Sequence, residues 1–251
     1  MGVEYCLFIV PKDRTFRPDS RQVANLANAL REGDWVPLPQ SSGHRSYALE
    51  LLPTASKGFT KKPAVEHAFQ DEEISPAWID SIRGHELALS WNVQNAHEAK
   101  VKYPLTFDPW PESGSPYFDI RTLDADDYFC ESSENVTYLD DSVLKCTCGN
   151  QLAYESGWSG MAGSRRIHRK CPDCGRIFDP STLACEIQDG WTGEPQVIMG
   201  GLNFRFALVI NCGKYFPHEE ERFREFKPRN ELLALWHSHI GVPFDQIDTV
   251  G

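Results

Sequence analysis

Both ends of the chain show the same hydrophobic pattern, a short apolar run followed by an amphipathic segment. Residues 4–10 (EYCLFIV) are rich in aromatic and branched side chains and predict a strand that stops at Pro11. Residues 19–35 place apolar side chains three and four positions apart, which predicts a helix. A strand over residues 204–210 (FRFALVI) and a helix over residues 230–241 (NELLALWHSHIG) repeat this order.

The middle of the chain adds further strand patterns. Residues 75–84 (SPAWIDSIRG) predict a short helix, and residues 86–93 (ELALSWNV) predict a strand. Alternation of apolar and polar side chains predicts another strand over residues 117–123 (YFDIRTL). The layout predicts the α+β class, with one sheet domain built from both chain ends and a cysteine-rich region inserted between its later elements.

The inserted region carries four of the eight cysteines of the chain. They form two close pairs, CTCG and CPDCG, separated by 22 residues and flanked by the strand-like segments NQLAYES and GRIFDP. The chain start has no pattern of a signal peptide, so we expect a cytoplasmic protein, in which paired cysteines indicate metal binding or redox chemistry. Four thiolates suit a tetrahedral metal ion. The predicted ligands are Cys146, Cys148, Cys171 and Cys174.

With these pairs, the segment over residues 144–180 resembles a zinc ribbon. The second pair, Cys171 and Cys174, matches the Cys-Pro-x-Cys-Gly knuckle of that family. The first pair is one residue shorter than usual, which leaves His168 or Cys185 as alternative ligands. The resemblance implies a structural Zn²⁺ ion and no reaction.

The resemblance also predicts a division of the chain. Residues 1–143 and 181–251 would form one α+β domain, and residues 144–180 would be the inserted zinc ribbon. Reduced thiols or one redox pair are the alternative interpretation of the cysteines. A thioredoxin-like pair would stand at the start of a helix, however, whereas CPDCG runs into RIFDP, which has no helical pattern.

The charge of the chain favours a basic partner. Its 25 basic and 36 acidic residues give a net charge of −11, which disfavours nucleic-acid binding by the surface as a whole. Residues 122–144 hold seven carboxylates and no lysine or arginine. We therefore predict recognition of a basic protein, as by an immunity or regulatory factor, through Asp124, Asp126 and Asp127. The alternative is a solvated acidic loop.

The segment between the cysteine pairs combines basic and aromatic side chains. This combination suits single-stranded nucleic acid, because cations neutralise phosphates and aromatic rings stack on bases. The candidate contacts are Tyr154, Trp158, Arg165, Arg166, Arg169 and Lys170. The alternative is a basic loop that docks on residues 122–144, the acidic run, and the sequence leaves open whether these two segments pair within one molecule.

Catalytic signatures are absent from the sequence. It contains no phosphate-binding P-loop, no dinucleotide fingerprint and no H-E-x-x-H motif. No apolar run approaches the roughly 20 residues of a membrane span, so we expect no membrane partner. Cys212 at the end of a predicted strand, with His218 nearby in sequence, is a weak candidate for a catalytic nucleophile. We expect a non-catalytic protein.

Overall fold

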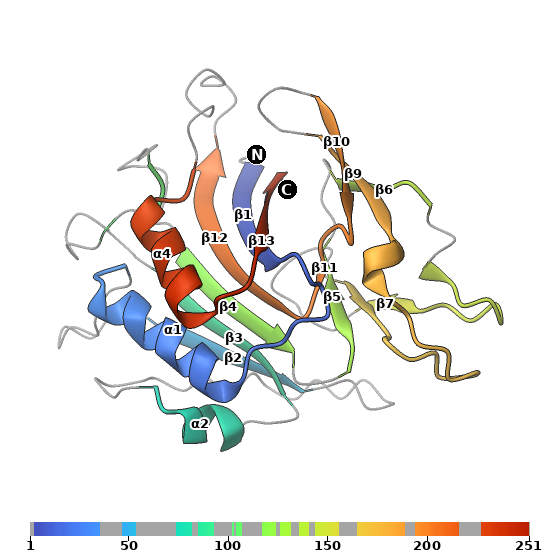
Figure 1. The fold of residues 1–251 in the computed structure, drawn as a ribbon, viewed down its shortest axis with the longest axis horizontal. Helices are drawn as coiled ribbons and strands as arrows, with labels where there is room; N and C mark the ends of the chain where they lie inside the picture. The colour runs from blue at the N-terminus through green and yellow to red at the C-terminus, as the bar shows by residue number, and fades with distance from the viewer. Residues whose placement is uncertain are drawn as a thin grey trace.

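The largest element is a six-stranded antiparallel sheet with the strand order β13-β1-β12-β4-β3-β2 (Figure 1). Its strands are β1 (Val3–Pro11), β2 (Tyr47–Pro53), β3 (His85–Asn92), β4 (Tyr117–Leu123), β12 (Phe206–Tyr215) and β13 (Phe244–Val250). The computed structural model describes residues 3–35, 47–53, 74–81, 85–92, 102, 104–106, 117–123, 126–131, 136–140, 144–155, 165–188, 194–215 and 227–250.

The first strand lies between two strands from the other end of the chain. Leu7 of β1 is opposite Ile210 of β12 on one side and Asp248 of β13 on the other. Leu7 and Phe8 are both buried although they face opposite sides of the sheet, so β1 is covered on both faces. This two-sided burial explains why its sequence is a continuous apolar run instead of an alternating one.

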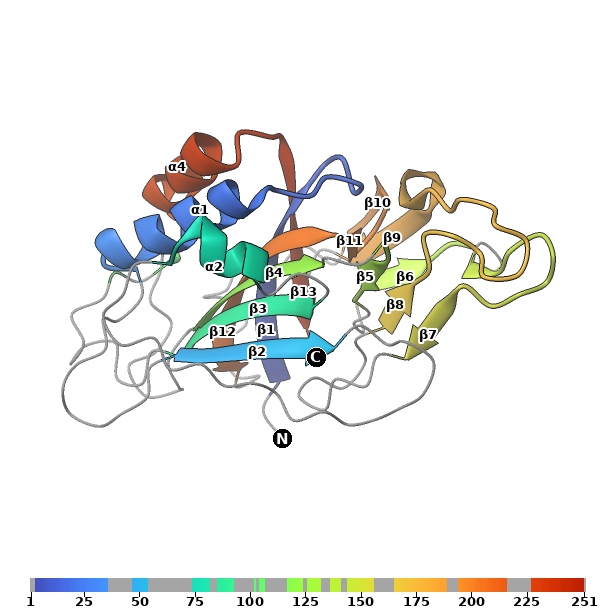
Figure 2. The same cartoon turned by 90° about the horizontal axis from the view of Figure 1, so that it is seen from below.

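Three helices cover one face of this sheet: α1 (Ser20–Glu32), α2 (Pro76–Ser81) and α4 (Asn230–His239) (Figure 2). Helix α1 begins with a capping box, in which Asp19 accepts from the Gln22 N–H and the Gln22 side chain accepts from the Asp19 N–H. Apolar residues of α1 and Trp236 of α4 join Phe206 of β12 in a single core. The predicted periodicity of both long helices is confirmed.

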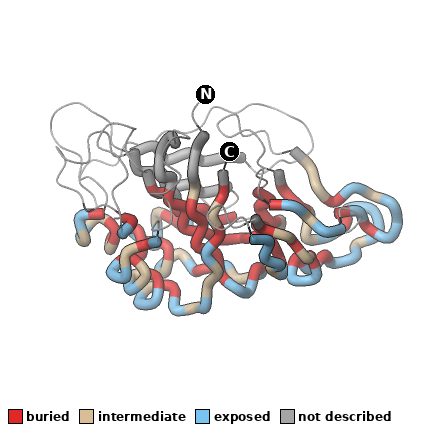
Figure 3. The backbone as a smooth tube through the Cα atoms, turned by 90° about the horizontal axis from the view of Figure 1, so that it is seen from above, coloured by how far each residue is buried: buried red, intermediate tan, exposed pale blue. Residues whose placement is uncertain are grey.

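The opposite face carries a second core and two smaller antiparallel sheets, in the orders β10-β9-β6 and β11-β5-β8-β7. Their strands are β5 (Tyr128–Cys130), β6 (Val136–Tyr138), β7 (Ala153–Glu155), β8 (Arg165–Ile167), β9 (Ala184–Gln188), β10 (Pro195–Met199) and β11 (Asn203–Phe204). The structure thus mixes strands and helices, with strands in the majority among the described residues. Buried positions concentrate where these layers meet (Figure 3).

The predicted strand over residues 204–210 is divided in the structure. Phe204 belongs to β11 and pairs with Phe129, whereas Phe206 begins β12 and pairs with Thr122. The chain therefore passes from a small sheet to the large one at Arg205. An apolar run cannot reveal this change, because both sheets accept apolar side chains.

Strands β7 and β8 lie within the cysteine region, whereas β5 and β11 lie outside it. Hydrogen bonding between β5 and β8 makes all four strands one sheet. The division at residues 144 and 180 stays a prediction, but the cysteine region shares this sheet with the rest of the chain. Among the described residues, none of the helices has the length and apolar character of a membrane crossing.

Candidate metal centre

The first cysteine pair lies in a tight turn. Lys145 and Gln151 form an isolated bridge that closes the turn, and the Cys146 N–H donates to the Asn150 carbonyl at 2.8 Å. Gly149 completes the reversal with a φ of +90°. This left-handed conformation is accessible to glycine at little cost, which explains the glycine after the second cysteine.

The second pair lies in a turn of the same design. Lys170 and Ile177 form the closing bridge, and the Cys171 N–H donates to the Arg176 carbonyl at 2.8 Å. Gly175 has a φ of +73°. The closing hydrogen bond of this turn spans one residue more than that of the first turn, in agreement with the extra residue between its cysteines. The shorter first pair is therefore still a complete sulfur-bearing turn.

The two turns bring the four sulfur atoms together. All four Sγ atoms lie within 4.8 Å of one another, with Cys146 3.4 Å from Cys174 and Cys148 3.6 Å from Cys171. Four sulfurs at the Zn–S distance of about 2.3 Å would be separated by about 3.8 Å on the edges of a tetrahedron. The donor set and its spacing therefore fit one tetrahedral metal ion.

The thiols of the cluster differ in pKa. The backbone N–H of Cys174 is the main cause that lowers the pKa of Cys171 to about 6, and the backbone N–H of Cys148 lowers that of Cys146. The pKa of Cys148 rises to about 12: the Asn150 N–H donates to its sulfur, but the sulfurs of Cys171 and Cys146 outweigh that effect. A cation among the four sulfurs would favour the thiolate form of all of them, because metal ligation requires deprotonated cysteines.

A small apolar core supports the cluster. Cys146 and Cys171 are buried in it beside Leu144, Leu152 and Phe178. The side-chain amide of Asn150 lies 3.9 Å from the Cys171 sulfur, so the first turn also contacts a cysteine of the second. Outer-shell contacts of this type orient metal ligands.

Neither alternative ligand joins the cluster. The His168 ring stacks on Tyr154 with 4.2 Å between centroids, and its Nδ1 lies 3.3 Å from Asp127 Oδ1. Cys185 is buried in a different core, where its thiol donates to the Thr137 carbonyl at 3.4 Å. Among the described residues, the candidate ligands are therefore the four paired cysteines alone.

No protein-family model, no curated protein and no solved structure matches this chain. The chemistry of the site therefore rests on its own geometry.

The basic segment meets the acidic run within one molecule. Arg169 donates to Asp126 at 2.9 Å, and the Tyr154 hydroxyl donates to Asp127 at 2.6 Å. Arg205 lies 3.9 Å from Asp126, whose side chain remains 74% exposed. Desolvation and the hydrogen bond to Asp127 raise the pKa of the Tyr154 phenol, so it remains a donor to Asp127 beyond the pH at which an exposed tyrosine ionises. These contacts hold the cysteine region against the acidic run.

The other predicted contact residues have different positions. Arg166 is 3% exposed and lies over the Phe129 ring, 5.7 Å from its centroid, so it is not a surface contact. Lys170 is exposed. Arg165 lies in β8, but its side chain is outside the described part, as are Asp124 and Trp158.

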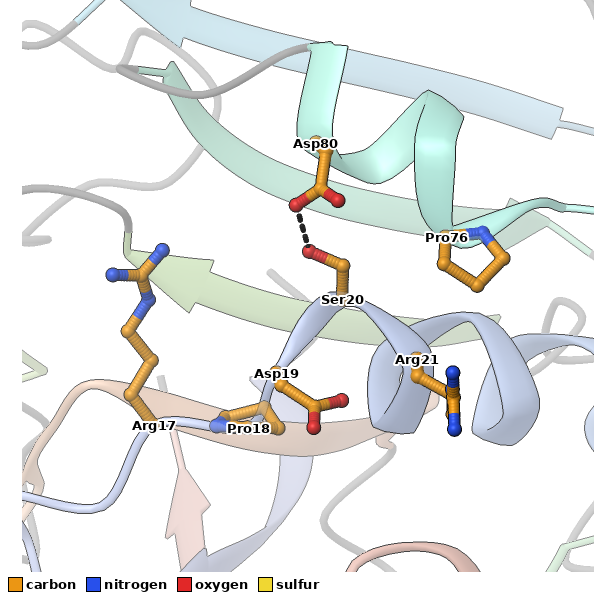
Figure 4. Close-up of a pocket in the computed structure, with 7 residues that line it drawn as sticks. All are labelled: Arg17, Pro18, Asp19, Ser20, Arg21, Pro76 and Asp80. Atoms are coloured by element: carbon orange, nitrogen blue, oxygen red, sulfur yellow. Dashed lines mark hydrogen bonds between the residues drawn. The ribbon is translucent and has the colours of Figure 1, made fainter.

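The candidate nucleophile Cys212 lies in β12, with its side chain outside the described part, and His218 is outside it altogether. One pocket of 680 Å³ opens between the N-terminal end of α1 and the short helix α2 (Figure 4). Ser20 donates to Asp80 across it. The lining contains two arginines and two aspartates, so its charges balance and indicate no ligand class.

Proposed function

We propose that this chain is a non-catalytic recognition protein, stabilised by a structural Zn²⁺ ion, that binds a basic protein partner. The observation that carries the structural part is the set of four cysteine sulfurs within 4.8 Å of one another. Four thiolates fill a tetrahedral shell and leave no position for a substrate or an activated water. A zinc-ribbon-like module over residues 144–180 agrees with this closed donor set.

The ion would act on stability. The core around the cysteines contains few large apolar side chains, among them Leu144, Ile167, Phe178 and Leu183. Binding of zinc by a site of this type supplies roughly 10–16 kcal/mol of apparent free energy in isolated fingers. That amount is enough to order two turns that have little regular structure of their own.

The net charge of −11 supports a basic partner. A surface with this excess of carboxylates attracts cationic proteins at long range and repels nucleic acid. The contacts of Arg169 and Tyr154 with the acidic run support an internal docking role for the basic segment, because the same groups are engaged with Asp126 and Asp127. We therefore favour the protein partner over nucleic acid.

The test of recognition uses three fluorescent probes of similar length: an oligolysine peptide, an oligoglutamate peptide and a single-stranded oligothymidine. We expect the oligolysine peptide alone to bind, with an affinity that falls as salt is added. Binding of oligothymidine that depends on Arg169 would instead assign the basic segment to nucleic acid. Absence of oligolysine binding at low salt would contradict the basic partner.

A further inference from the structure

The three-stranded sheet presents an apolar face to solvent. Val197 and Met199 of β10 are 60% and 53% exposed, and Leu139 at the end of β6 is 54% exposed. Across the sheet, Met199 is opposite Ala184, which in turn accepts a hydrogen bond from the Leu139 N–H. The three exposed side chains therefore lie over one outward face, whereas Ile198 points to the opposite face and packs against the second core.

Strand β10 ends this sheet, and its register shows which backbone groups face outward. The Gly200 N–H donates to the Leu183 carbonyl at 2.7 Å, so the pair of residues 200 and 183 is a hydrogen-bonded pair. Because such pairs alternate in an antiparallel ladder, residues 198 and 196 also bond to β9. The N–H and C=O groups of Val197 and Met199 therefore point to the side away from β9, where the described part of the chain has no further strand.

The composition of β10 contrasts with that of another edge strand. Strand β13, at the edge of the six-stranded sheet, carries Asp245, Gln246 and Asp248, and such polar side chains discourage strand pairing. Strand β10 (PQVIM) contains no charged residue. Its proline at position 195 removes one outward N–H at the start of the strand, so the outward donors of β10 are those of Val197 and Met199. The β10 edge therefore lacks the charged side chains that normally discourage an edge strand from pairing with another strand.

Carboxylates lie on and next to the outward face. The segments 136–140, 184–188 and 194–200 contain Asp140, Glu186 and Glu194 and no lysine or arginine. Glu186 is opposite both Val197 and Thr137, which places it in the middle of the outward face. A lysine or arginine side chain laid over Val197 could direct its charged end to Glu186 while its aliphatic stem stays on the apolar surface.

We propose that β10 is the docking edge for the basic partner. The partner adds an extended strand in which apolar residues alternate with lysine or arginine. This inference rests on the proposed function and specifies its binding site. Main-chain hydrogen bonds to Val197 and Met199 supply the pairing, and the outward face with Glu186 selects basic sequences. A second copy of this chain fits less well, because each copy carries a net charge of −11 and a segment 195–199 without cations.

The test uses a fluorescent peptide of alternating valine and lysine, with a valine–glutamate peptide as the charge control. The Val197→Pro variant removes one outward N–H and leaves the bonds to β9 in place. We expect it to weaken binding of the valine–lysine peptide about tenfold or more, since a lost pairing hydrogen bond and the displaced strand act together. A Val197→Lys, Met199→Lys double variant should weaken binding to a similar extent by charge repulsion.

The matched control is Ile177→Lys, which places a cation at another exposed apolar residue, next to the second cysteine turn. It should bind the valine–lysine peptide within about twofold of the parent chain, because its charge lies outside the β10 face. Circular dichroism and metal content identify variants that have lost the fold. Equal binding by the parent chain and both β10 variants would overturn the docking edge while leaving the basic partner intact.

Other results separate the remaining assignments. Failure of both oligolysine and the valine–lysine peptide to bind would overturn the basic partner and the docking edge together. Equal binding of the valine–glutamate peptide would overturn the basic character of the partner strand. A parent chain that is dimeric in solution and becomes monomeric on Val197→Pro would assign the edge to a second copy and overturn the partner strand.

Discussion

At the scale of single residues, Arg14 joins three parts of the chain. Its buried guanidinium donates to the carbonyls of Pro11 and Gly201 and pairs with Asp245 at 2.8 Å. Gly200 has a φ of +84°, and a Cβ there would lie 2.6 Å from Arg14 Cγ. The turn after β10 can therefore approach Arg14 only with glycine at position 200.

We expect Gly200→Ala to lower the free energy of unfolding by more than the left-handed conformation alone would cause. The matched control is Gly241→Ala, where φ is +74° and the nearest atom to a Cβ is 3.7 Å away. In both variants the left-handed backbone conformation costs about 1–2 kcal/mol. Gly200→Ala adds about 1–3 kcal/mol from overpacking against Arg14. Denaturant titration measures both, and equal losses would show that the Arg14 contact does not matter.

Cys185 predicts an alkaline pH dependence. Burial raises the pKa of its thiol to about 12 in the folded chain, compared with 9.0 for the free group. Between these values the unfolded chain loses the proton and the folded chain keeps it, so stability falls as pH rises from 9 to 12. The slope is at most about 1.4 kcal/mol per pH unit.

The Cys185→Ala variant should lack this contribution. Its free energy of unfolding, measured by denaturant titration at several pH values, should fall less steeply above pH 9 than that of the parent chain. Parallel curves for the two chains would show that the buried thiol does not titrate in this way.

At the scale of elements, the sequence pattern alone predicted those helices and strands whose own residues determine their structure. The periodicity of α1 and its Asp19 cap predicted the helix, and alternation predicted β4 with the bounds that the structure shows. The short strands β5, β8 and β10 were not predicted, because strands of three to five residues depend on their pairing partners. The strand-like segment GRIFDP forms a single isolated bridge, between Ile177 and Lys170, instead of a strand.

The capping box of α1 makes a prediction for that element. Asp19→Ala should lower the free energy of unfolding by about 1 kcal/mol, because the Gln22 N–H loses its acceptor. Asp19→Asn is the matched control, since asparagine caps a helix about as well as aspartate. Thermal unfolding compares the three chains, and an alanine variant as stable as the asparagine variant would contradict the role of the cap.

At the scale of the whole molecule, the candidate metal centre was more predictable than its surroundings. The spacing within each cysteine pair predicted four ligands, and the structure brings their sulfurs together. The hydrogen bond of Tyr154 to Asp127 and the apolar face over β10 were not predictable in the same way. The first joins residues 127 and 154, and the second needs Leu139 next to β9 and β10, so both depend on contacts that form only in the folded sheets.

This arrangement links the candidate metal centre to one of the small sheets and, through the chain, to the large one. The cysteine turns support the hairpin of β7 and β8, which is paired to β5 and through it to β11. The chain continues from β11 into β12 of the large sheet through Arg205. Removal of a metal ion bound by the four cysteines should therefore disturb the small sheets first and leave the helix-covered face of the large sheet less affected.

The most direct test of this account is the metal content of the protein purified without added metal, measured by elemental mass spectrometry on the parent chain and on Cys171→Ser. Cys6→Ser is the control, because Cys6 packs against the second core and is not among the clustered cysteines. We predict about one zinc per chain in the parent and in Cys6→Ser, and loss of zinc in Cys171→Ser. A metal-free parent chain, or zinc retained in full by Cys171→Ser, would contradict the structural zinc site.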